Sequence, residues 1–245
     1  MNCKLCLKNA PLAKSHIIPK FIYTLMHDQR GHYAEVRDVD AGKVILGQGG
    51  VCEKLLCSKC ESRLNRYERH ARRLFVDELP ELQSGRTRRI QIPNLNYSLF
   101  KLFILSIVWR AGVSSSPFFR HVKLGPHADR IRSMLNSDNP GPPGMYPCVI
   151  QVLLLEGKHL KGFMVDPIPV RIDGHRAYYF VFGGFLFTAF ISGHTLSSVL
   201  ERAHITDKQP IFAFRTEIGD VEFLREVWNR AIDTTRDVKI RFGEE

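Results

Sequence analysis

The segment that decides the fold of the N-terminal part is Leu55-Leu56-Cys57-Ser58-Lys59-Cys60-Glu61, in which two cysteines are separated by two residues. A second pair with the same spacing, Cys3-Lys4-Leu5-Cys6, lies near the N-terminus. Each tight turn of this kind aims two sulfurs at a common point, so two such pairs present four thiolates to one tetrahedral Zn²⁺. We therefore predict one structural zinc ion, bound by Cys3, Cys6, Cys57 and Cys60.

Two other interpretations of these cysteines stay open. They are a redox-active pair of the thioredoxin type, or thiols buried as small apolar side chains. Redox pairs with this spacing normally occur once and beside a βαβ pattern, whereas here two pairs flank a hairpin-like stretch, which favours zinc. The second pair also opens a predicted helix, residues 61–75, whose N-terminal dipole favours thiolate over thiol.

The composition is that of an ordinary intracellular protein. The 245 residues allow one large domain or two smaller ones, and the apolar content of 44% argues against wholesale disorder. Six cysteines, four of them in the two pairs, do not resemble a secreted disulfide scaffold. Cys3 and Cys6 stand where a signal peptide would need its apolar core, so we expect a cytoplasmic protein. The net charge of +10 indicates an anionic partner, with nucleic acid the leading candidate.

The residue pattern along the chain changes near residue 92, because the paired cysteines and most of the clustered arginines lie before it. This change predicts two domains, residues 1–92 and 93–245. In the first, residues 31–50 alternate apolar and polar side chains between glycines, which predicts a β-hairpin inserted between the cysteine pairs.

In the second part, residues 94–111 are apolar nearly all round, as in a buried helix, and residues 138–147 (DNPGPPGMYP) form a Pro/Gly loop. Asp220 is expected to cap a last, amphipathic helix. Apolar and alternating runs predict strands of one mostly antiparallel sheet at residues 149–155, 162–165, 178–182, 185–191 and 211–215. The predicted fold class is α+β, and no motif in this second part indicates a reaction.

Residues 177–200 contain no Lys, Arg, Asp or Glu, so a membrane span has to be considered. Aromatic and β-branched residues on both sides of Gly183-Gly184 indicate instead a hairpin whose turn needs positive φ. Ser192 and His194 also make the second half too polar for a good span. We expect a buried hairpin and no membrane partner.

Ten residues after Cys6 comes His16, followed by Ile17-Ile18-Pro19, and the second cysteine pair then leads into a helix. This order resembles the four-cysteine branch of the HNH endonucleases over residues 1–76. The resemblance implies a treble-clef zinc module with a ββα-metal core. In that family a strand-borne His deprotonates a water that attacks a phosphodiester, and a divalent ion stabilises the leaving oxygen. By position, His16 matches this general base.

The chemistry of His16 agrees with the resemblance. An imidazole with a pKa near 6.5 is the usual group for taking a proton from water at neutral pH. The zinc knuckle on one side and Pro19 on the other would hold the strand that carries it. Two other roles stay open, a histidine that merely packs and an alternative zinc ligand. Four cysteines already supply the four ligands of a tetrahedral zinc ion, which favours the general-base role of His16.

The chain departs from the family pattern at three places. Ser15 stands where catalytic members usually carry a metal-binding Asp or His, Cys52-Glu53 falls in the region of a middle Asn, and Glu61 replaces a final His or Asn. These changes mean either a different ligand set or a lost activity.

A substitute ligand set is available on the predicted helix. Glu61, Asn65 and Glu68 lie at i, i+4 and i+7, so they share one helix face. Their oxygens suit Mg²⁺ or Mn²⁺, which we expect as the catalytic ion. The alternatives are that Glu61 complements the helix dipole and that Glu68 pairs with Arg72.

The same helix carries an unbalanced run of arginines. Guanidinium groups suit phosphate oxygens, so this run is the predicted nucleic-acid-binding surface, although charge runs are more often solvated, salt-bridged helix faces. The candidate phosphate-binding residues are Arg63, Arg66, Arg69 and Arg73.

The prediction is therefore a metal-dependent DNA endonuclease, a role compatible with a defence or toxin effector. Its C-terminal domain would serve specificity, assembly or a protein partner. The alternative is a non-catalytic zinc module that binds nucleic acid or a protein, with His16 a relic.

Overall fold

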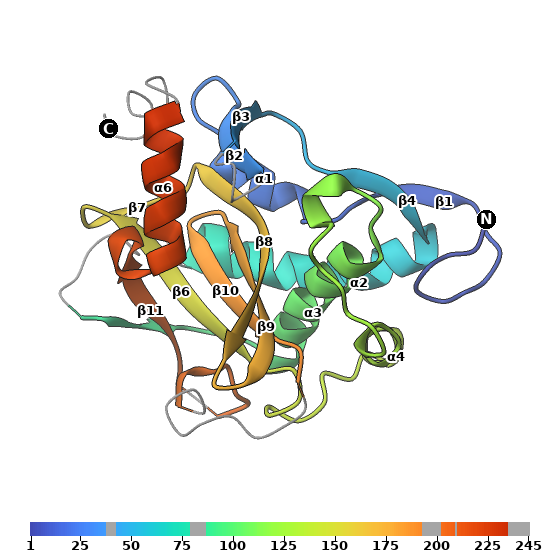
Figure 1. The fold of residues 1–245 in the computed structure, drawn as a ribbon. Helices are drawn as coiled ribbons and strands as arrows, with labels where there is room; N and C mark the ends of the chain where they lie inside the picture. The colour runs from blue at the N-terminus through green and yellow to red at the C-terminus, as the bar shows by residue number, and fades with distance from the viewer. Residues whose placement is uncertain (38–42, 79–86, 193–201, 209, 235–245) are drawn as a thin grey trace.

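The computed structural model describes residues 1–37, 43–78, 87–192, 202–208 and 210–234. These residues form an α+β fold in which helices lie on both faces of one large sheet. A small two-stranded sheet and the N-terminus lie at one end of the molecule, on the right in Figure 1. The predicted fold class is confirmed.

The large sheet has nine strands in the described part of the chain. They are β2 (Tyr33–Arg37), β3 (Lys43–Gly47), β5 (Arg89–Ile92), β6 (Cys148–Leu155), β7 (Lys158–His159), β8 (Phe163–Ile172), β9 (His175–Phe182), β10 (Phe185–Phe190) and β11 (Ile211–Glu217). Their order is β3-β2-β8-β9-β10-β6-β11-β5, and β7 pairs with β6. Only β2 with β8 and β6 with β11 are parallel among these pairs, so the sheet is mostly antiparallel, as expected.

One predicted strand is longer than expected. The sequence indicates residues 162–165, but β8 continues to Ile172 through Pro167 and Pro169. A register shift between Val165 and Ile168 accommodates Pro167, because a bulge removes the need for regular ladder hydrogen bonds where proline has no N–H.

The charge-free run covers the β9–β10 hairpin from Ala177 onward, where residues on both faces are buried, which explains the lack of charges there. Phe180, Phe182 and Phe187 belong to the core shared with the central helices. Val181 and Leu186 point to the opposite face, where they join the core under the last helix. The hairpin prediction is confirmed up to Ser192, and residues 193–200 lie outside the described part. No helix in the described segments is long and apolar enough to cross a membrane.

The turn of this hairpin yields a first prediction, that Gly184→Ala destabilises the protein more than Gly183→Ala. Both glycines have positive φ, so either alanine meets a cost of roughly 1–2 kcal/mol. At Gly184 the added Cβ would also overlap the imidazole of His159, whose Nε2 lies 3.0 Å from the Gly184 carbonyl oxygen. At Gly183 the nearest atom, on Ile22, would be 3.5 Å away. Urea unfolding measures the two losses, and equal losses would contradict the proposed contact.

In the described part of the chain three helices lie close to their predicted positions, and two more, at residues 20–26 and 127–137, have no counterpart in the sequence predictions. The helices are α1 (Lys20–Met26), α2 (Ser58–Arg72), α3 (Tyr97–Val113), α4 (His127–Ser137) and α6 (Glu222–Thr234). The start of α2 precedes the predicted residue 61, because Cys57 already has the extended backbone of an N-cap. In α3, Asn96 caps the helix by accepting a hydrogen bond from the Leu99 N–H over 3.0 Å. Asp220, expected as a cap, lies instead in the short 3₁₀ turn Ile218–Asp220 that precedes α6.

The predicted hairpin at residues 31–50 is present as β2 and β3, but it does not stand alone. The second edge of β2 pairs in parallel with β8, far along the chain. One apolar core also contains residues from both sides of residue 92, such as Leu64 of α2 and Phe103 of α3. The boundary at residue 92 stays a prediction, and the two segments on either side of it share a sheet and a core.

Candidate metal and catalytic site

Three elements frame the site. Strands β1 (Leu12–His16) and β4 (Cys52–Cys57) pair antiparallel, with Leu12 opposite Cys57 and His16 opposite Cys52. Helix α2 follows β4 without a connecting loop. The N-terminal loop lies against the same strand, since the Lys4 N–H donates to the Leu55 carbonyl oxygen over 2.9 Å. The end of the β1–β4 pair that carries Leu12 and Cys57 is therefore held at the start of α2.

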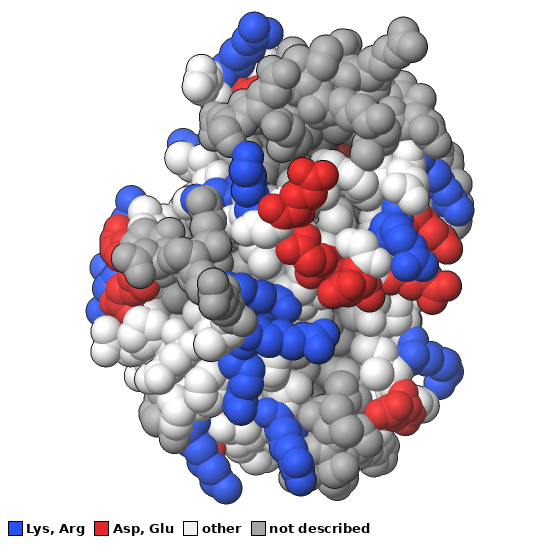
Figure 2. All heavy atoms as spheres, turned by 90° about the vertical axis from the view of Figure 1, so that its left-hand side faces the viewer, with Lys and Arg blue, Asp and Glu red and all other residues white. Residues whose placement is uncertain are grey.

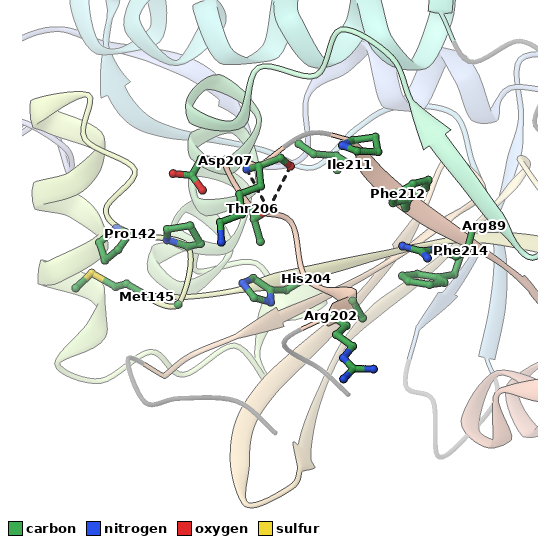
Figure 3. A pocket seen from close by; sticks show the side chains of 15 residues that line it. Arg89, Pro142, Met145, Arg202, His204, Thr206, Asp207, Ile211, Phe212 and Phe214 are labelled. Atoms are coloured by element: carbon green, nitrogen blue, oxygen red, sulfur yellow. Dashed lines mark hydrogen bonds between the residues drawn. The ribbon is translucent and has the colours of Figure 1, made fainter. Parts of the chain in front are cut away.

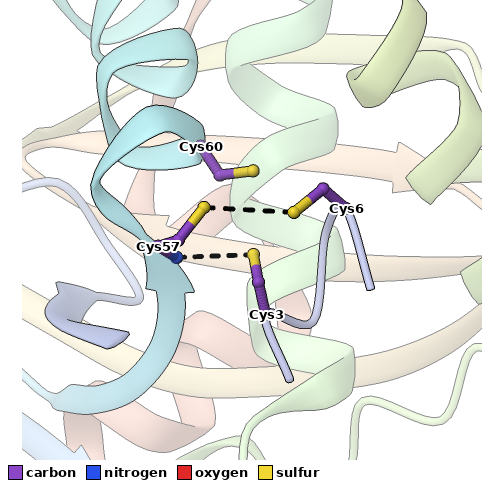
Figure 4. A group of neighbouring side chains, drawn as sticks. All are labelled: Cys3, Cys6, Cys57 and Cys60. Atoms are coloured by element: carbon purple, nitrogen blue, oxygen red, sulfur yellow. Dashed lines mark hydrogen bonds between the residues drawn. The ribbon is translucent and has the colours of Figure 1, made fainter. Parts of the chain in front are cut away.

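The four paired cysteines meet at this junction, as Figure 4 shows. Their sulfurs all lie within 4.8 Å of one another, and those of Cys6 and Cys57 are 3.9 Å apart. Zinc–sulfur bonds of about 2.3 Å in a tetrahedron place the sulfurs about 3.8 Å apart. The cluster therefore has the ligands and the spacing to hold a zinc ion, and it is the only such group of His, Cys, Asp or Glu found in the described residues.

The protonation of these thiols also fits a metal site. Burial opposes ionisation of Cys3, but the N–H groups of Cys6, Cys57 and Leu5 donate to its sulfur and lower its pKa to about 7. Burial and the neighbouring thiols raise the pKa of Cys60. Four thiolates cannot share this space without a cation, and a bound metal ion displaces the protons that they would otherwise hold.

His16, the predicted base, is the last residue of β1 and is half-buried. Its ring lies 6.3 Å from that of Tyr23 on α1, measured between centroids. Burial lowers the pKa of its imidazole, nearby Lys20 lowers it further, and Glu68 acts in the opposite direction. The imidazole is therefore neutral at pH 7, which is the form that accepts a proton.

Ser15 and Glu61, two departures from the expected pattern, are in contact. The fully buried Ser15 hydroxyl donates a hydrogen bond to a carboxylate oxygen of Glu61, in the first turn of α2. The contact brings the Glu61 carboxylate to Ser15, the residue that precedes His16 in the chain. Metal binding by Glu61 stays a prediction.

The other two predicted metal ligands differ in their surroundings. Asn65 is exposed on α2. Glu68 does not form the alternative pair with Arg72. Its carboxylate lies 2.9 Å from Nη1 of Arg110, a fully buried residue of α3. A carboxylate already paired with a buried cation is a poorer ligand for a second cation, so Glu61 is the better candidate of the three.

Glu53, in the region of the expected Asn, has a different partner. Its carboxylate accepts hydrogen bonds from the backbone N–H groups of Ser115 and Ser116, at 3.0 to 3.1 Å, and from the hydroxyls of Ser114 and Ser115. Burial alone would raise the pKa of this carboxyl, but these hydrogen bonds outweigh it and lower the pKa. Glu53 therefore ties β4 to the segment after α3.

The four predicted phosphate-binding arginines, three on α2 and Arg73 directly after it, divide into two groups. Arg63 donates to Asn136 and Arg66 lies 2.6 Å from Asp138, so both attach α2 to the end of α4. Arg73 lies 3.0 Å from Glu78. Arg69 is exposed. Of the four predicted phosphate-binding residues, three have anionic or amide partners in the protein. These partners weaken the case that the four arginines form one phosphate-binding surface.

Basic side chains also gather on a second face of the molecule, beside a group of acidic ones (Figure 2). Strands β5 and β11 pair antiparallel, and the Arg215 N–H donates to the Arg88 carbonyl oxygen over 2.8 Å, so these arginines are neighbours. Next to them lies a cavity of about 630 Å³, into which Figure 3 shows Arg89 pointing beside Phe214. Part of its wall is the stretch 202–208, which lies between segments outside the description.

Sequence reasoning missed Arg110 and the role of Glu53. The signal for Arg110 is its position, since it is one of two charged residues in a helix that is mostly apolar, and a buried cation requires a partner. No comparable signal marks Glu53, whose partners are backbone groups.

No family model matches this chain, and neither a curated protein nor a solved structure matches it. The fold and the cysteine cluster define an α+β protein with an N-terminal four-cysteine site that could hold a zinc ion.

Proposed function

We propose that this protein is a metal-dependent DNA endonuclease of the HNH type, with a treble-clef zinc module formed by β1, β4 and α2. The observation that carries the proposal is the position of His16. It ends the strand that pairs with β4, directly after Ser15 in the chain, on a frame that begins at the cysteine cluster. A neutral, half-buried imidazole on a rigid frame is the arrangement that general-base catalysis requires.

In this reaction His16 would accept a proton from a water molecule. The water oxygen would form a bond to phosphorus, the bond from phosphorus to the leaving oxygen would break, and that oxygen would take a proton from solvent. Glu61 and Ser15 supply the oxygens that would hold Mg²⁺ or Mn²⁺, which stabilises negative charge on the leaving oxygen when bound.

The decisive experiment incubates the zinc-loaded protein with supercoiled plasmid in Mg²⁺, in Mn²⁺ or in EDTA. We expect nicked and linear products with a divalent ion and none with EDTA. EDTA also removes zinc, so a parallel sample is treated with EDTA and then given back zinc alone. Products in that sample would contradict a separate catalytic ion.

A second candidate function, a zinc module that binds nucleic acid or a protein without cutting, is favoured by one observation. Glu61 accepts a hydrogen bond from Ser15, and Glu68 forms an ion pair with Arg110. The cysteine cluster is then the only group in the described segments that is arranged to bind a metal ion. Equilibrium binding of Mn²⁺, followed by electron paramagnetic resonance on zinc-loaded protein, separates the candidates. One bound Mn²⁺ that is lost in Glu61→Ala supports the endonuclease, and no binding supports the module.

If α2 binds DNA, Arg69→Glu should weaken binding to all sequences alike and flatten its salt dependence. Each phosphate contact contributes about one unit to the slope of log affinity against log salt, because it releases about one counterion. Arg230→Glu on α6 is the matched control, since it makes the same charge change in an exposed residue of another helix. Titrations at several salt concentrations measure both variants. If Arg69→Glu has no effect, the interface lies elsewhere, with the β5–β11 face next to be tested.

Action as a defence or toxin effector, and a protein partner for the C-terminal part, stay predictions.

A further inference from the structure

Arg110 is a buried cation that connects three elements. Its Nη1 donates to the His16 carbonyl oxygen over 2.7 Å and lies 2.9 Å from Oε1 of Glu68. Its Nε and Nη2 donate to the carbonyl and hydroxyl oxygens of Ser106, each over 3.2 Å. One guanidinium group thus joins the end of β1 to α2 and α3.

The packing of α3 does not explain an arginine at this position. The neighbours of Arg110 on this helix, Trp109 and Ala111, are buried and apolar. Taking a charge out of water costs several kcal/mol, and replacing a buried ion pair by apolar side chains is often neutral or stabilising. The residue is better explained by what its guanidinium holds in place.

Arg110 and His16 share one charged neighbour, Glu68. The charged side chains that act on the His16 imidazole come from four elements: Lys14 of β1, Lys20 of α1, Glu68 of α2 and Arg110 of α3. Glu68 is the single acid in this set and also the ion-pair partner of Arg110. Tyr23 of α1 packs near the ring itself.

We propose that Arg110 is a positioning residue for His16, and that Glu68 acts with it by holding its guanidinium. The inference rests on the proposed function, because that function assigns His16 to the reaction. The hydrogen bond to the carbonyl oxygen fixes the residue from which the imidazole projects. Glu68 is then part of this support and does not bind the catalytic ion.

The shape of arginine explains why a lysine would not serve. A guanidinium has five N–H donors in a fixed plane, so it can contact the His16 carbonyl, Glu68 and Ser106 together. A lysine ammonium is a compact point charge on a flexible stem, with three donors from a single atom. A lysine at this position would keep the positive charge but could not make the three contacts at once.

Arg110→Lys tests the proposal in plasmid cleavage. A misplacement of about 1 Å in an active site costs about a hundredfold in rate, so we expect kcat to fall about ten- to a hundredfold, with KM and zinc content unchanged. Arg37→Lys is the matched control, because Arg37 also pairs with a buried carboxylate, that of Glu35, at 2.6 Å, on strand β2. It should cut like the parent. An unchanged kcat in Arg110→Lys would overturn the proposal.

An NMR measurement separates this inference from the proposed function. The imidazole ¹H–¹³C signal of His16, identified by its loss in His16→Ala, is recorded without nucleic acid. Arg110→Lys should move or broaden that signal, and Arg37→Lys should leave it in place. If the parent protein cuts nothing, the proposed function fails, yet the signal still reports on positioning. A signal that Arg110→Lys leaves unmoved overturns the inference.

Glu68→Gln covers the case in which Arg110→Lys does not fold. It keeps the size of the side chain and removes the charge that holds the guanidinium. It should lower kcat in the same direction and move the His16 signal, without loss of zinc. An unmoved signal and an unchanged kcat would overturn the proposal.

Discussion

A Cys57→Ser protein should contain no bound zinc and should lose the folded structure of its N-terminal part. Cys6 and Cys57 are 51 residues apart in the chain, so the metal closes a long loop, and its bonds add to the hydrogen bonds that link Lys4 with Leu55 and Cys57 with Cys3. Structural zinc sites of this kind contribute about 10–16 kcal/mol of apparent binding free energy, which is also folding free energy. A site with three thiolates retains only part of this binding free energy, so it binds zinc more weakly. Elemental analysis and thermal melting measure the two effects.

The control for this prediction lies on the same strand. Cys52 belongs to β4 but not to the cluster, so Cys52→Ser should keep the zinc and melt near the parent. A Cys57→Ser protein with full zinc content and unchanged melting would remove the cysteine cluster as the metal site.

His16→Ala should abolish cleavage while leaving zinc content and DNA affinity nearly intact. A general base contributes about a hundred- to ten-thousand-fold in rate, and neither the zinc site nor the proposed DNA contacts use the imidazole. The pH dependence has a defined sign. The base must be unprotonated, and burial and Lys20 lower the pKa of His16, so the rate should fall only as the pH drops below the usual histidine range. Plasmid cleavage from pH 5 to 8 measures it.

Two other variants should behave differently from His16→Ala. His121→Ala changes an exposed histidine outside β1, β4 and α2 and should cut like the parent. Glu61→Ala should instead raise the Mg²⁺ or Mn²⁺ concentration needed for cleavage, because it removes a proposed ligand and not the base. If His16→Ala cuts as fast as the parent, the proposed catalytic residue is wrong.

Local chemistry made much of this fold predictable. The spacing of Cys57 and Cys60 sets the geometry of a turn that needs no long-range information. The Gly183-Gly184 turn needs positive φ, which few other residues adopt without cost, and it marks the β9–β10 hairpin. Long apolar runs likewise predict α3 and β6 within a few residues.

Predictions that depend on tertiary contacts were less complete. A stripe of arginines on a helix does not reveal that Arg66 faces Asp138, because that aspartate belongs to a turn far along the chain. In the same way, helix spacing places Glu68 on the face of Glu61 but not beside Arg110. Both residues have partners on another element, and single-sequence patterns carry no information on such pairs.

The parallel pairing of β2 with β8 has a consequence for biosynthesis. The four cysteines of the cluster leave the ribosome well before Phe163, the first residue of β8. Zinc can therefore close the loop between the two cysteine pairs while the β2–β3 hairpin still lacks its neighbouring strand β8. Until β8 arrives, β2 exposes a row of unpaired backbone groups that can pair with another chain. Truncated or stalled products that end between Cys60 and Phe163 are therefore the species in which aggregation should begin.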